Sequence, residues 1–432
     1  MRAILPQGDI FYGWWILAAS AVALTLISGV TFWSPTLYVG PLEEEFGWSR
    51  AEVTAGFSIA FLMMGLTGPL VGRWVDVSGA RWILAAGGLL VGASFLLVAT
   101  TSSLWQWYLY LSINTAFRQL ILFIPLQTLV SRWFLRRRGF ALGVLAAASA
   151  VGGLIIVPVL RLIIDNVGWE TSFVITGVAV AAVFVPLGLL VRESPADMQT
   201  YPDGVRPTDA ELAAPLPAQG VALATALRTP IFWALTLALG LFFFSFFGFM
   251  VHQVPFYESV GVSRGVAAVL VAIMAGFTIF SRLGIGAFAD RIDRVERLAM
   301  TLCAFLMAGM ATLLLNSAAA GIAVFLVLFI LGSGAGPVLQ PLLLMRTFGV
   351  SHYGAIYGAS IVVQTASMTF SPVIAGAMFD ASGNYEWVLV MFLCTFAASL
   401  SLFYLASRLP HPAWETPADA RELELAPAGV SR

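Results

Sequence analysis

Long apolar segments constrain this chain more than any other feature. A helix that crosses a membrane needs roughly 20 apolar residues, and at least ten segments reach that length, separated by short polar gaps. Lipid offers the backbone no hydrogen-bond partners, so apolar spans of this length have to form helices. The segments lack the alternation of apolar and polar residues that marks a membrane barrel strand. The chain is therefore predicted to be an all-α protein embedded in a lipid bilayer.

The composition agrees with a chain that exposes little surface to water. Only 10% of the 432 residues are charged, against about 25% in an ordinary soluble domain. The net charge of −1 offers no general attraction to nucleic acid. Cys303 and Cys394 both fall in apolar segments, where they are expected to pack rather than form a disulfide or bind metal. The first apolar segment, from about Gly13, lacks a small-residue cleavage site, which favours a retained helix over a signal peptide.

Twelve helices are predicted, in two six-helix bundles over residues 1–192 and 229–408. Residues 193–228 are rich in Pro, Ala, Asp and Glu and are expected to form a cytoplasmic linker. The charged tail over 409–432 is expected to be cytoplasmic and disordered. The predicted helices run over 13–37, 51–72, 81–101, 104–130, 138–161, 169–191, 231–256, 264–287, 298–317, 320–345, 353–378 and 386–407.

The distribution of arginine predicts how the chain crosses the membrane. Cytoplasmic loops of membrane proteins carry an excess of basic residues. With both termini inside, most loop arginines become cytoplasmic, and only Arg50, Arg161 and Arg264 fall outside. We therefore expect a multi-pass protein of the cell (plasma or inner) membrane with both termini in the cytoplasm.

The two halves also repeat one another in sequence. Gly286 and Asp290 follow Gly72 and Asp76 by 214 positions, and a further set recurs at an offset of 215. Such parallel halves place a substrate site between them near the middle of the membrane. The second set pairs Gly139, Gly143 and Asp165 with Gly354, Gly358 and Asp380.

The repeated loop resembles a known signature. Residues 72–81 read GRWVDVSGAR, which resembles the G-x-x-x-D-R-x-G-R-R loop of the major facilitator superfamily, and residues 286–291 repeat its first half as GAFADR, ending at Arg291. The glycine lets two helices approach closely, while the aspartate caps a neighbouring helix or pairs with an arginine to close the cytoplasmic face. Because Val77 replaces the usual arginine, Arg73 or Arg81 is expected to serve in the first copy.

A narrower resemblance points to one branch of that family. Residues 131–143, SRWFLRRRGFALG, include Arg137 and resemble the W-F-x-K-R-R-x-x-A-x-G signature of monocarboxylate porters and oxalate/formate exchangers. Residues 12–15, YGWW, are similar to their first-helix Gly-Trp motif, although the usual preceding acid is absent. Residues 281–286, SRLGIG, align Arg282 with the arginine that binds the substrate carboxylate in those porters. Thr278 stands where they carry an acid, which weakens an inference of proton coupling.

Two arginines lie inside the predicted helices, whereas acidic residues occur only near helix ends. A charge at the bilayer centre costs roughly 2.5–3.5 kcal/mol on insertion scales, so it normally faces a cavity. Arg282 either binds a substrate carboxylate, in the bidentate manner of arginine, or extends to the cytoplasmic interface. Arg118 either faces the cavity as a second cation or caps carbonyls at a kink near Pro125. A cavity with this charge should attract an anion.

Several polar or aromatic residues in the spans are further candidates for substrate contacts. Each polar one could instead form a hydrogen bond between helices. His252 could carry a proton, because imidazole titrates near neutral pH, or could simply be hydrogen-bonded near the outer end of its helix. Gln364 is neutral where the exchangers carry a second cation, which argues against a small dicarboxylate. The candidates are Asn114, Phe123, Gln127, His252 and Gln364.

Together these features predict a secondary transporter that moves a small organic anion, a monocarboxylate, by alternating access. A coupled proton could travel on the substrate, on His252, or not at all. Two alternatives stay open: an exporter of drugs or other lipophilic compounds, and a non-transporting receptor or sensor. The spans contain no nucleophile, metal or cofactor constellation, so we expect no enzyme activity, no cofactor and no nucleic-acid partner. A monomer is expected.

Overall fold

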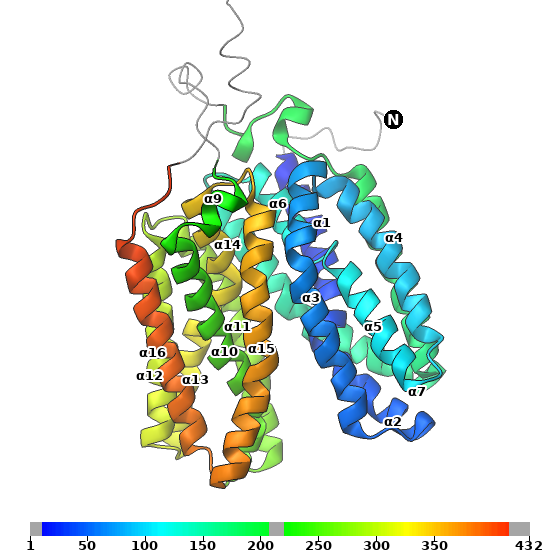
Figure 1. Ribbon diagram of the computed structural model, residues 1–432, viewed down its shortest axis with the longest axis vertical. Helices are drawn as coiled ribbons and strands as arrows, with labels where there is room; N and C mark the ends of the chain where they lie inside the picture. Colours follow the sequence, from blue (N-terminus) through cyan, green and yellow to red (C-terminus); the bar gives the residue numbers. More distant parts are fainter. Residues whose placement is uncertain (1–10, 207–219, 414–432) are drawn as a thin grey trace, which may run out of the picture.

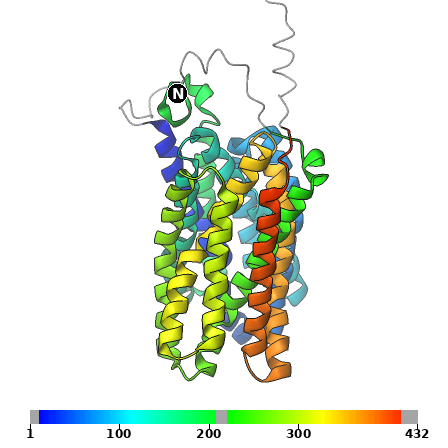
Figure 2. The same ribbon diagram turned by 90° about the vertical axis from the view of Figure 1, so that its left-hand side faces the viewer.

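The computed structural model describes residues 11–206 and 220–413. Within these ranges the chain is built from helices that run side by side along one direction (Figures 1 and 2). Eleven of them are long and apolar enough to cross a membrane. The prediction of an all-α membrane protein is thus confirmed. Residues 207–219 of the predicted linker (193–228) and 414–432 of the predicted tail (409–432) lie outside the described residues.

The helices form two bundles, one from α1 to α7 and the other from α9 to α16 (Figure 1). The first bundle contains α1 (Tyr12–Ser28), α2 (Val39–Phe46), α3 (Arg50–Ser78), α4 (Ala80–Ala99), α5 (Leu104–Arg118), α6 (Phe123–Trp133) and α7 (Arg138–Leu190). The second contains α9 (Leu223–Leu227), α10 (Pro230–Ser259), α11 (Arg264–Ala289), α12 (Val295–Leu315), α13 (Ala319–Ser333), α14 (Ala335–Phe348), α15 (Tyr353–Ser382) and α16 (Glu386–Arg408).

The long helix α7 contains two of the predicted spans and reverses direction at a single residue. Gly168 has φ 83° and ψ 166°, a conformation that glycine adopts readily because it lacks a Cβ. Both ends of α7 then lie near the start of α1: the Tyr12 hydroxyl donates to the Leu190 carbonyl, and the Trp14 ring lies 6.3 Å from that of Phe140. Counted as two spans, α7 brings the total among the described residues to the predicted twelve.

Three predicted helices are interrupted. The span expected over 104–130 divides into α5 and α6, since Pro125 supplies no N–H for the carbonyl of Ile121. The span expected over 320–345 divides into α13 and α14 around Gly334, three residues before Pro337. The first span changes to a short π-helix at Gly29–Trp33, and α2 follows before α3. Pattern alone marks the length of such spans but not their breaks.

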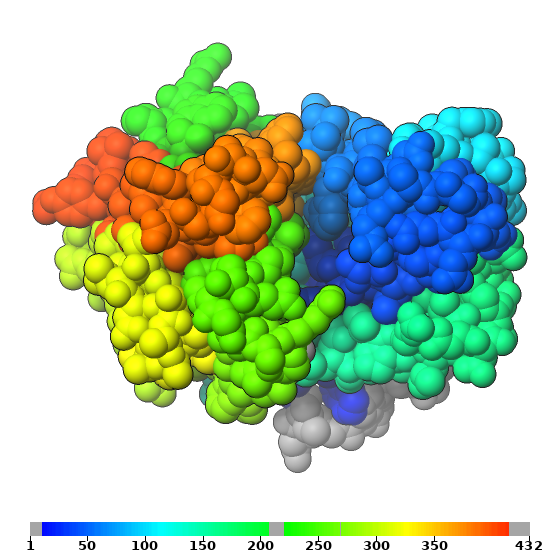
Figure 3. Space-filling view, turned by 90° about the horizontal axis from the view of Figure 1, so that it is seen from below, coloured from blue at the N-terminus to red at the C-terminus, as the bar shows by residue number. Residues whose placement is uncertain are grey.

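The two bundles touch along two helix pairs at the end of the molecule where α1 begins. There α3 crosses α15, and the first part of α7 crosses α11. At the opposite end the bundles separate (Figure 1), and Figure 3 looks from that side into the hollow between them. We call these the closed end and the open end.

Candidate functional site

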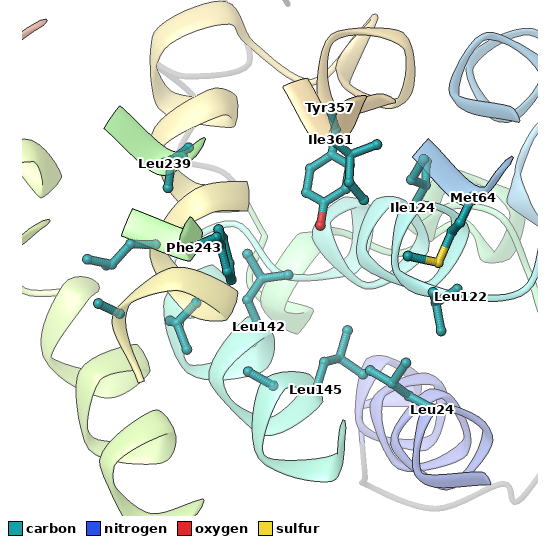
Figure 4. Close-up of a cluster of buried hydrophobic side chains, with 14 of the residues drawn as sticks. Leu24, Met64, Leu122, Ile124, Leu142, Leu145, Leu239, Phe243, Tyr357 and Ile361 are labelled. Atoms are coloured by element: carbon teal, nitrogen blue, oxygen red, sulfur yellow. The ribbon is translucent and has the colours of Figure 1, made fainter. Parts of the chain in front are cut away.

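A central cavity of about 410 Å³ lies between the two bundles. Elements of both bundles line it, namely the π-helix Gly29–Trp33, α3, α6 and α7 from the first and α10, α11, α13, α14 and α15 from the second. The volume falls within the range of small-molecule sites, roughly 300–1,000 Å³. Toward the closed end, Tyr357 and Ile361 of α15 meet Met64, Ile124 and Leu142 of the first bundle in an apolar cluster (Figure 4).

Arg282 is the only charged residue among the described residues that line this cavity. It lies on α11 and is 7% exposed. Its Nη1 donates across the gap between the bundles, to the Ala146 carbonyl at 2.6 Å and to Ser149 Oγ at 2.9 Å. Its buried Nε has no hydrogen-bond partner among the described residues. A buried donor without a partner is unfavourable, so this guanidinium edge is suited to receive an acceptor from a ligand.

Two glutamines add further free hydrogen-bonding groups to the same cavity. Gln253 Oε1 on α10 and Gln340 Nε2 on α14 are buried, and neither atom has a partner among the described residues. Buried polar groups are nearly always paired in folded proteins. Together with Arg282 Nε, they provide one acceptor and two donors that a polar ligand could satisfy.

The rest of the cavity wall is largely aromatic and thioether. Met, with its flexible and polarisable side chain, adapts to ligands of varied shape. The aromatic lining residues are Phe32, Trp33, Phe123, Phe243, Phe246, Phe247, Phe329 and Tyr357, and the methionines are Met64, Met250, Met274 and Met368. Three of these aromatics, Phe243, Phe246 and Phe247, lie on α10.

Three of the predicted contact residues, which lie on two helices, join Arg282 at the cavity. Phe123 and Gln127 line it from α6, and Gln364 lines it from α15. Gln127 Oε1 accepts a hydrogen bond from the Tyr353 hydroxyl at 2.8 Å, which links α6 to α15. Gln364 Nε2 donates to Ser360 Oγ at 3.5 Å.

Arg118 and Asn114 lie elsewhere, which differs from the expectation that they contact substrate with Arg282. Arg118 lines a separate cavity inside the first bundle, where its Nε donates to Asn114 Oδ1 at 2.6 Å. Asn114 in turn donates to Ser94 Oγ at 2.8 Å. Arg118 ends α5 without donating to the carbonyls of the break near Pro125, so it matches neither predicted role.

His252 does not line the central cavity. It lies in α10, where one ring nitrogen is 3.2 Å from the Tyr385 hydroxyl and the other is 2.9 Å from the Pro372 carbonyl oxygen. Both ring nitrogens therefore have partners within the second bundle. This geometry matches the hydrogen-bonded alternative for His252 and gives no support to a role as the cavity's proton carrier.

At the closed end, the repeated aspartates cap helices of the opposite bundle. Asp76 accepts hydrogen bonds from the backbone N–H groups of Gly354 and Ala355, both at 2.8 Å. Asp290 accepts from those of Gly139 at 2.5 Å and Phe140 at 2.8 Å. Each carboxylate thus lies at a helix N-terminus, where unpaired N–H groups and the helix dipole favour negative charge.

Glycines allow the helices of the two bundles to pack closely at the closed end. A Cβ on Gly72 would lie 1.9 Å from the Gly354 carbonyl oxygen, and one on Gly286 would lie 2.5 Å from that of Gly139. Side chains at these four positions would collide with backbone. Each glycine of the loop motif (Gly72, Gly286) therefore packs against a glycine of the second recurring set (Gly354, Gly139) in the opposite bundle.

The arginines of the motif do not cross between the bundles. Arg81 donates to the carbonyls of Gly188 and Leu189, so it joins α4 to α7 within the first bundle. Arg137 lies over the Trp14 ring at 6.0 Å. The side chain of Arg291 is exposed, as is that of Arg73. The expectation that Arg73 or Arg81 holds the closed end together is wrong in this conformation, since backbone N–H groups take that role.

The surroundings of Asp290 lead us to expect that the closed end responds to pH. Burial raises the pKa of this carboxyl, while its two backbone hydrogen bonds and Arg346 lower the pKa, and Asp203 raises it. Since the net shift is upward, the carboxyl holds a proton more readily here than in a state that hydrates it. Lowering the pH through the range just above the ordinary aspartate pKa should therefore favour the conformation in which this end is closed.

This pH dependence can be measured as a distance between spin labels at the open end. Thr54→Cys on α3 and Val266→Cys on α11 place labels at exposed positions, in a Cys394→Ser background. Between about pH 4 and pH 7, acidification should increase the population with widely separated labels. The Asp290→Asn variant should reduce this change, since Asp76 remains as a second carboxyl at the closed end, and an identical titration in both proteins would contradict the role of Asp290.

Sequence reasoning missed residues that act through main-chain groups or lie far away in the chain. Ser149 and the Ala146 carbonyl bind Arg282, and Tyr353 binds Gln127. No sequence motif identifies a backbone carbonyl that will bind a side chain. Ser149 lies in a run of small residues, a pattern that predicts helix packing rather than a polar contact. The position of Tyr353 next to Gly354, a member of the recurring set, was the one available signal.

Comparison with known proteins gives a family and several relatives. Residues 19–366 match the model of the Major Facilitator Superfamily. The oxalate:formate antiporter of Oxalobacter formigenes is 26% identical over 399 residues, covering 91% of this chain and 90% of the relative. Monocarboxylate transporter 2 of Mus musculus is 23% identical over 411 residues, covering 89% of this chain and 81% of the relative.

A solved structure shows the same fold. A proton:xylose symporter bound to 6-bromo-6-deoxy-D-glucose superposes with a TM-score of 0.72 at 15% identity, over 95% of this chain and 99% of that one. At this identity the similarity concerns the arrangement of helices alone.

Proposed function

The chain belongs to the Major Facilitator Superfamily, whose members are multi-pass membrane transporters and not enzymes, and we propose that it carries a singly charged organic acid by alternating access. The observation that carries this proposal is the free Nε edge of Arg282 in a central cavity with no other charged lining residue among those described. The named relatives include transporters of oxalate, formate and monocarboxylates, which supports an anionic substrate.

The charge of the cavity favours one carboxylate on the substrate. A guanidinium can donate two parallel N–H bonds to a carboxylate, and Nη1 of Arg282 is already bound to Ala146 and Ser149. The Nε side is then the edge for bidentate binding. A second carboxylate would face Gln364, Gln340 or aromatic rings rather than a cation, and burying an unpaired charge is strongly unfavourable.

The volume and the walls favour an acid with a sizeable apolar group. Lactate or formate would leave most of the 410 Å³ to water against phenylalanine and methionine side chains. An aromatic or branched acid would bury apolar surface there, at roughly 25 cal/mol per Å². We therefore place acids of the size of benzoate and phenylacetate ahead of formate, oxalate and lactate.

The conformation is consistent with one state of an alternating cycle. The bundles meet at the closed end and separate at the open end (Figure 3). With both termini and the Arg132–Arg138 loop in the cytoplasm, as the arginine distribution indicates, the cavity would face outward. Neutralisation of Arg282 by the substrate would then allow the bundles to rock. No Asp, Glu or His is among the described lining residues, so the proposal assigns no proton to a cavity side chain.

Uptake of labelled acids into proteoliposomes tests the substrate class. We expect benzoate and phenylacetate to enter faster than empty-liposome controls and to compete with each other, while oxalate competes at least tenfold more weakly. The apolar walls also suit the exporter of lipophilic compounds considered above. Transport of a lipophilic cation, with no uptake of any carboxylate, would favour that exporter and overturn the anion proposal.

A further inference from the structure

A second cavity, separate from the central one, lies inside the first bundle and contains a buried cation. Its volume is about 30 Å³, enough for one water molecule or one small ion but too small for an organic acid. Arg118, Thr31 and Tyr38 are among its lining residues, with Phe61 and Phe95. No acidic residue is among the described residues that line it.

Arg118 has hydrogen-bond capacity left over. The residue is 5% exposed. Its Nε and Nη2 both donate to the neutral Asn114 Oδ1, and its Cζ lies 5.0 Å from the centre of the Phe95 ring. Nη1 has no hydrogen-bond partner among the described residues, and the guanidinium has no ion-pair partner there. A buried charge without a counter-charge is strongly disfavoured.

Thr31 offers an independent second donor to the same space. It lies in the π-helical turn of the first span and is 3% exposed. Its hydroxyl is buried and has no partner among the described residues. A guanidinium N–H and a free hydroxyl that line one ion-sized cavity form a site for an acceptor with negative charge.

Aromatic rings separate this cavity from the central one. Phe61 lines the small cavity and Phe32 lines the central cavity, and their ring centres are 6.0 Å apart. Phe32 also packs against Phe123, at 6.1 Å. A ligand at Arg118 would therefore not touch a ligand at Arg282.

We propose that this cavity binds a small monovalent inorganic anion of the size of chloride, as a fixed counter-ion for Arg118. The anion would accept hydrogen bonds from Arg118 Nη1 and Thr31 Oγ1, and would neutralise the buried guanidinium. It would hold together the first span and α5, and it would not be cargo. This site does not depend on which acid the central cavity carries.

Thermal unfolding of the purified protein tests the site. Chloride and bromide are compared with gluconate, which is too large for the cavity, at equal ionic strength. Because gluconate is itself a carboxylate that the central cavity could bind, the comparison is made in the wild type and in Arg282→Gln. A ligand that binds only the folded state raises the midpoint of unfolding, and for a chain of this size the expected rise is about 2–4 °C with saturation. Equal midpoints in chloride and gluconate would overturn the proposal.

Two variants test whether chloride raises the midpoint of unfolding by binding at Arg118. Arg118→Gln should lose the dependence on chloride, while Arg282→Gln, which removes the other buried guanidinium, should keep it. A chloride effect that survives in Arg118→Gln would place the anion elsewhere and refute the site. If Arg118→Gln does not fold, Thr31→Val should weaken the chloride effect, and crystals of the wild-type protein grown in bromide should show an anomalous peak beside Arg118. The absence of that peak would overturn the proposal.

Discussion

Replacement of Arg282 with glutamine is expected to lower the apparent affinity for the transported acid by about 10- to 100-fold. Hydrogen bonds to charged groups contribute about 1.5–3 kcal/mol, and each 1.4 kcal/mol is a factor of about ten. Glutamine keeps a single donor nitrogen, its amide NH2 group, but loses the charge and the second parallel bond. Uptake should suffer more than protein stability, since Arg282 Nε has no partner among the described residues.

The matched control is Arg264→Gln on the same helix. Arg264 lies at the open end of α11, its side chain is 87% exposed, and it faces Glu258 at 3.8 Å. Exposed ion pairs contribute little, so this variant should transport like the wild type. Uptake by Arg282→Gln at the rate of Arg264→Gln would remove Arg282 from the substrate site.

Replacement of Gly72 with valine is expected to abolish the closed end seen here. The new Cβ would lie 1.9 Å from the Gly354 carbonyl oxygen, and backbone cannot move aside as a flexible side chain can. The bundles would have to part, which would break both hydrogen bonds of Asp76. We expect the labels at Thr54→Cys and Val266→Cys to move closer together, and uptake to fall by about tenfold or more.

Gly284→Val on α11 controls for the cost of valine in a helix. A Cβ at Gly284 meets no atom within 4 Å, so this variant should keep the wild-type label distances and uptake. Size-exclusion chromatography of both variants would separate a conformational shift from misfolding, because overpacking can also destabilise the fold. Wild-type label distances in a folded Gly72→Val protein would show that the glycine contact is not required.

The helical fold was predictable because the apolar spans are long and the repeat offset is constant. The breaks were less predictable. Pro125 was read as a kink within one helix, yet the chain there leaves helical geometry at Leu122, with ψ −136°. Gly168 was assigned to a loop between spans, whereas it reverses the chain alone. These outcomes depend on tertiary packing, which periodicity does not report.

The candidate site was predictable only in part. Arg282 stood out because a lone charge in a span is rare, and the structure places it at the central cavity. Arg118 carried the same signal but faces another space, since hydropathy does not say toward which neighbour a helix turns a residue. Asp76 and Asp290 were expected to cap helices or pair with arginines, and only coordinates distinguish a backbone N–H from a guanidinium as the partner.

The composition of the closed end has a consequence for how abruptly the protein can change state. Its closest contacts are glycine against backbone and carboxylate against peptide N–H, and main-chain groups within helices have no alternative rotamers. A contact surface of this kind cannot loosen one side chain at a time, as an interface of lysines and glutamates can. It either fits or separates, so intermediate openings should be scarcely populated. Single-molecule recordings of the bundle separation should accordingly show sharp jumps between two levels rather than a continuum.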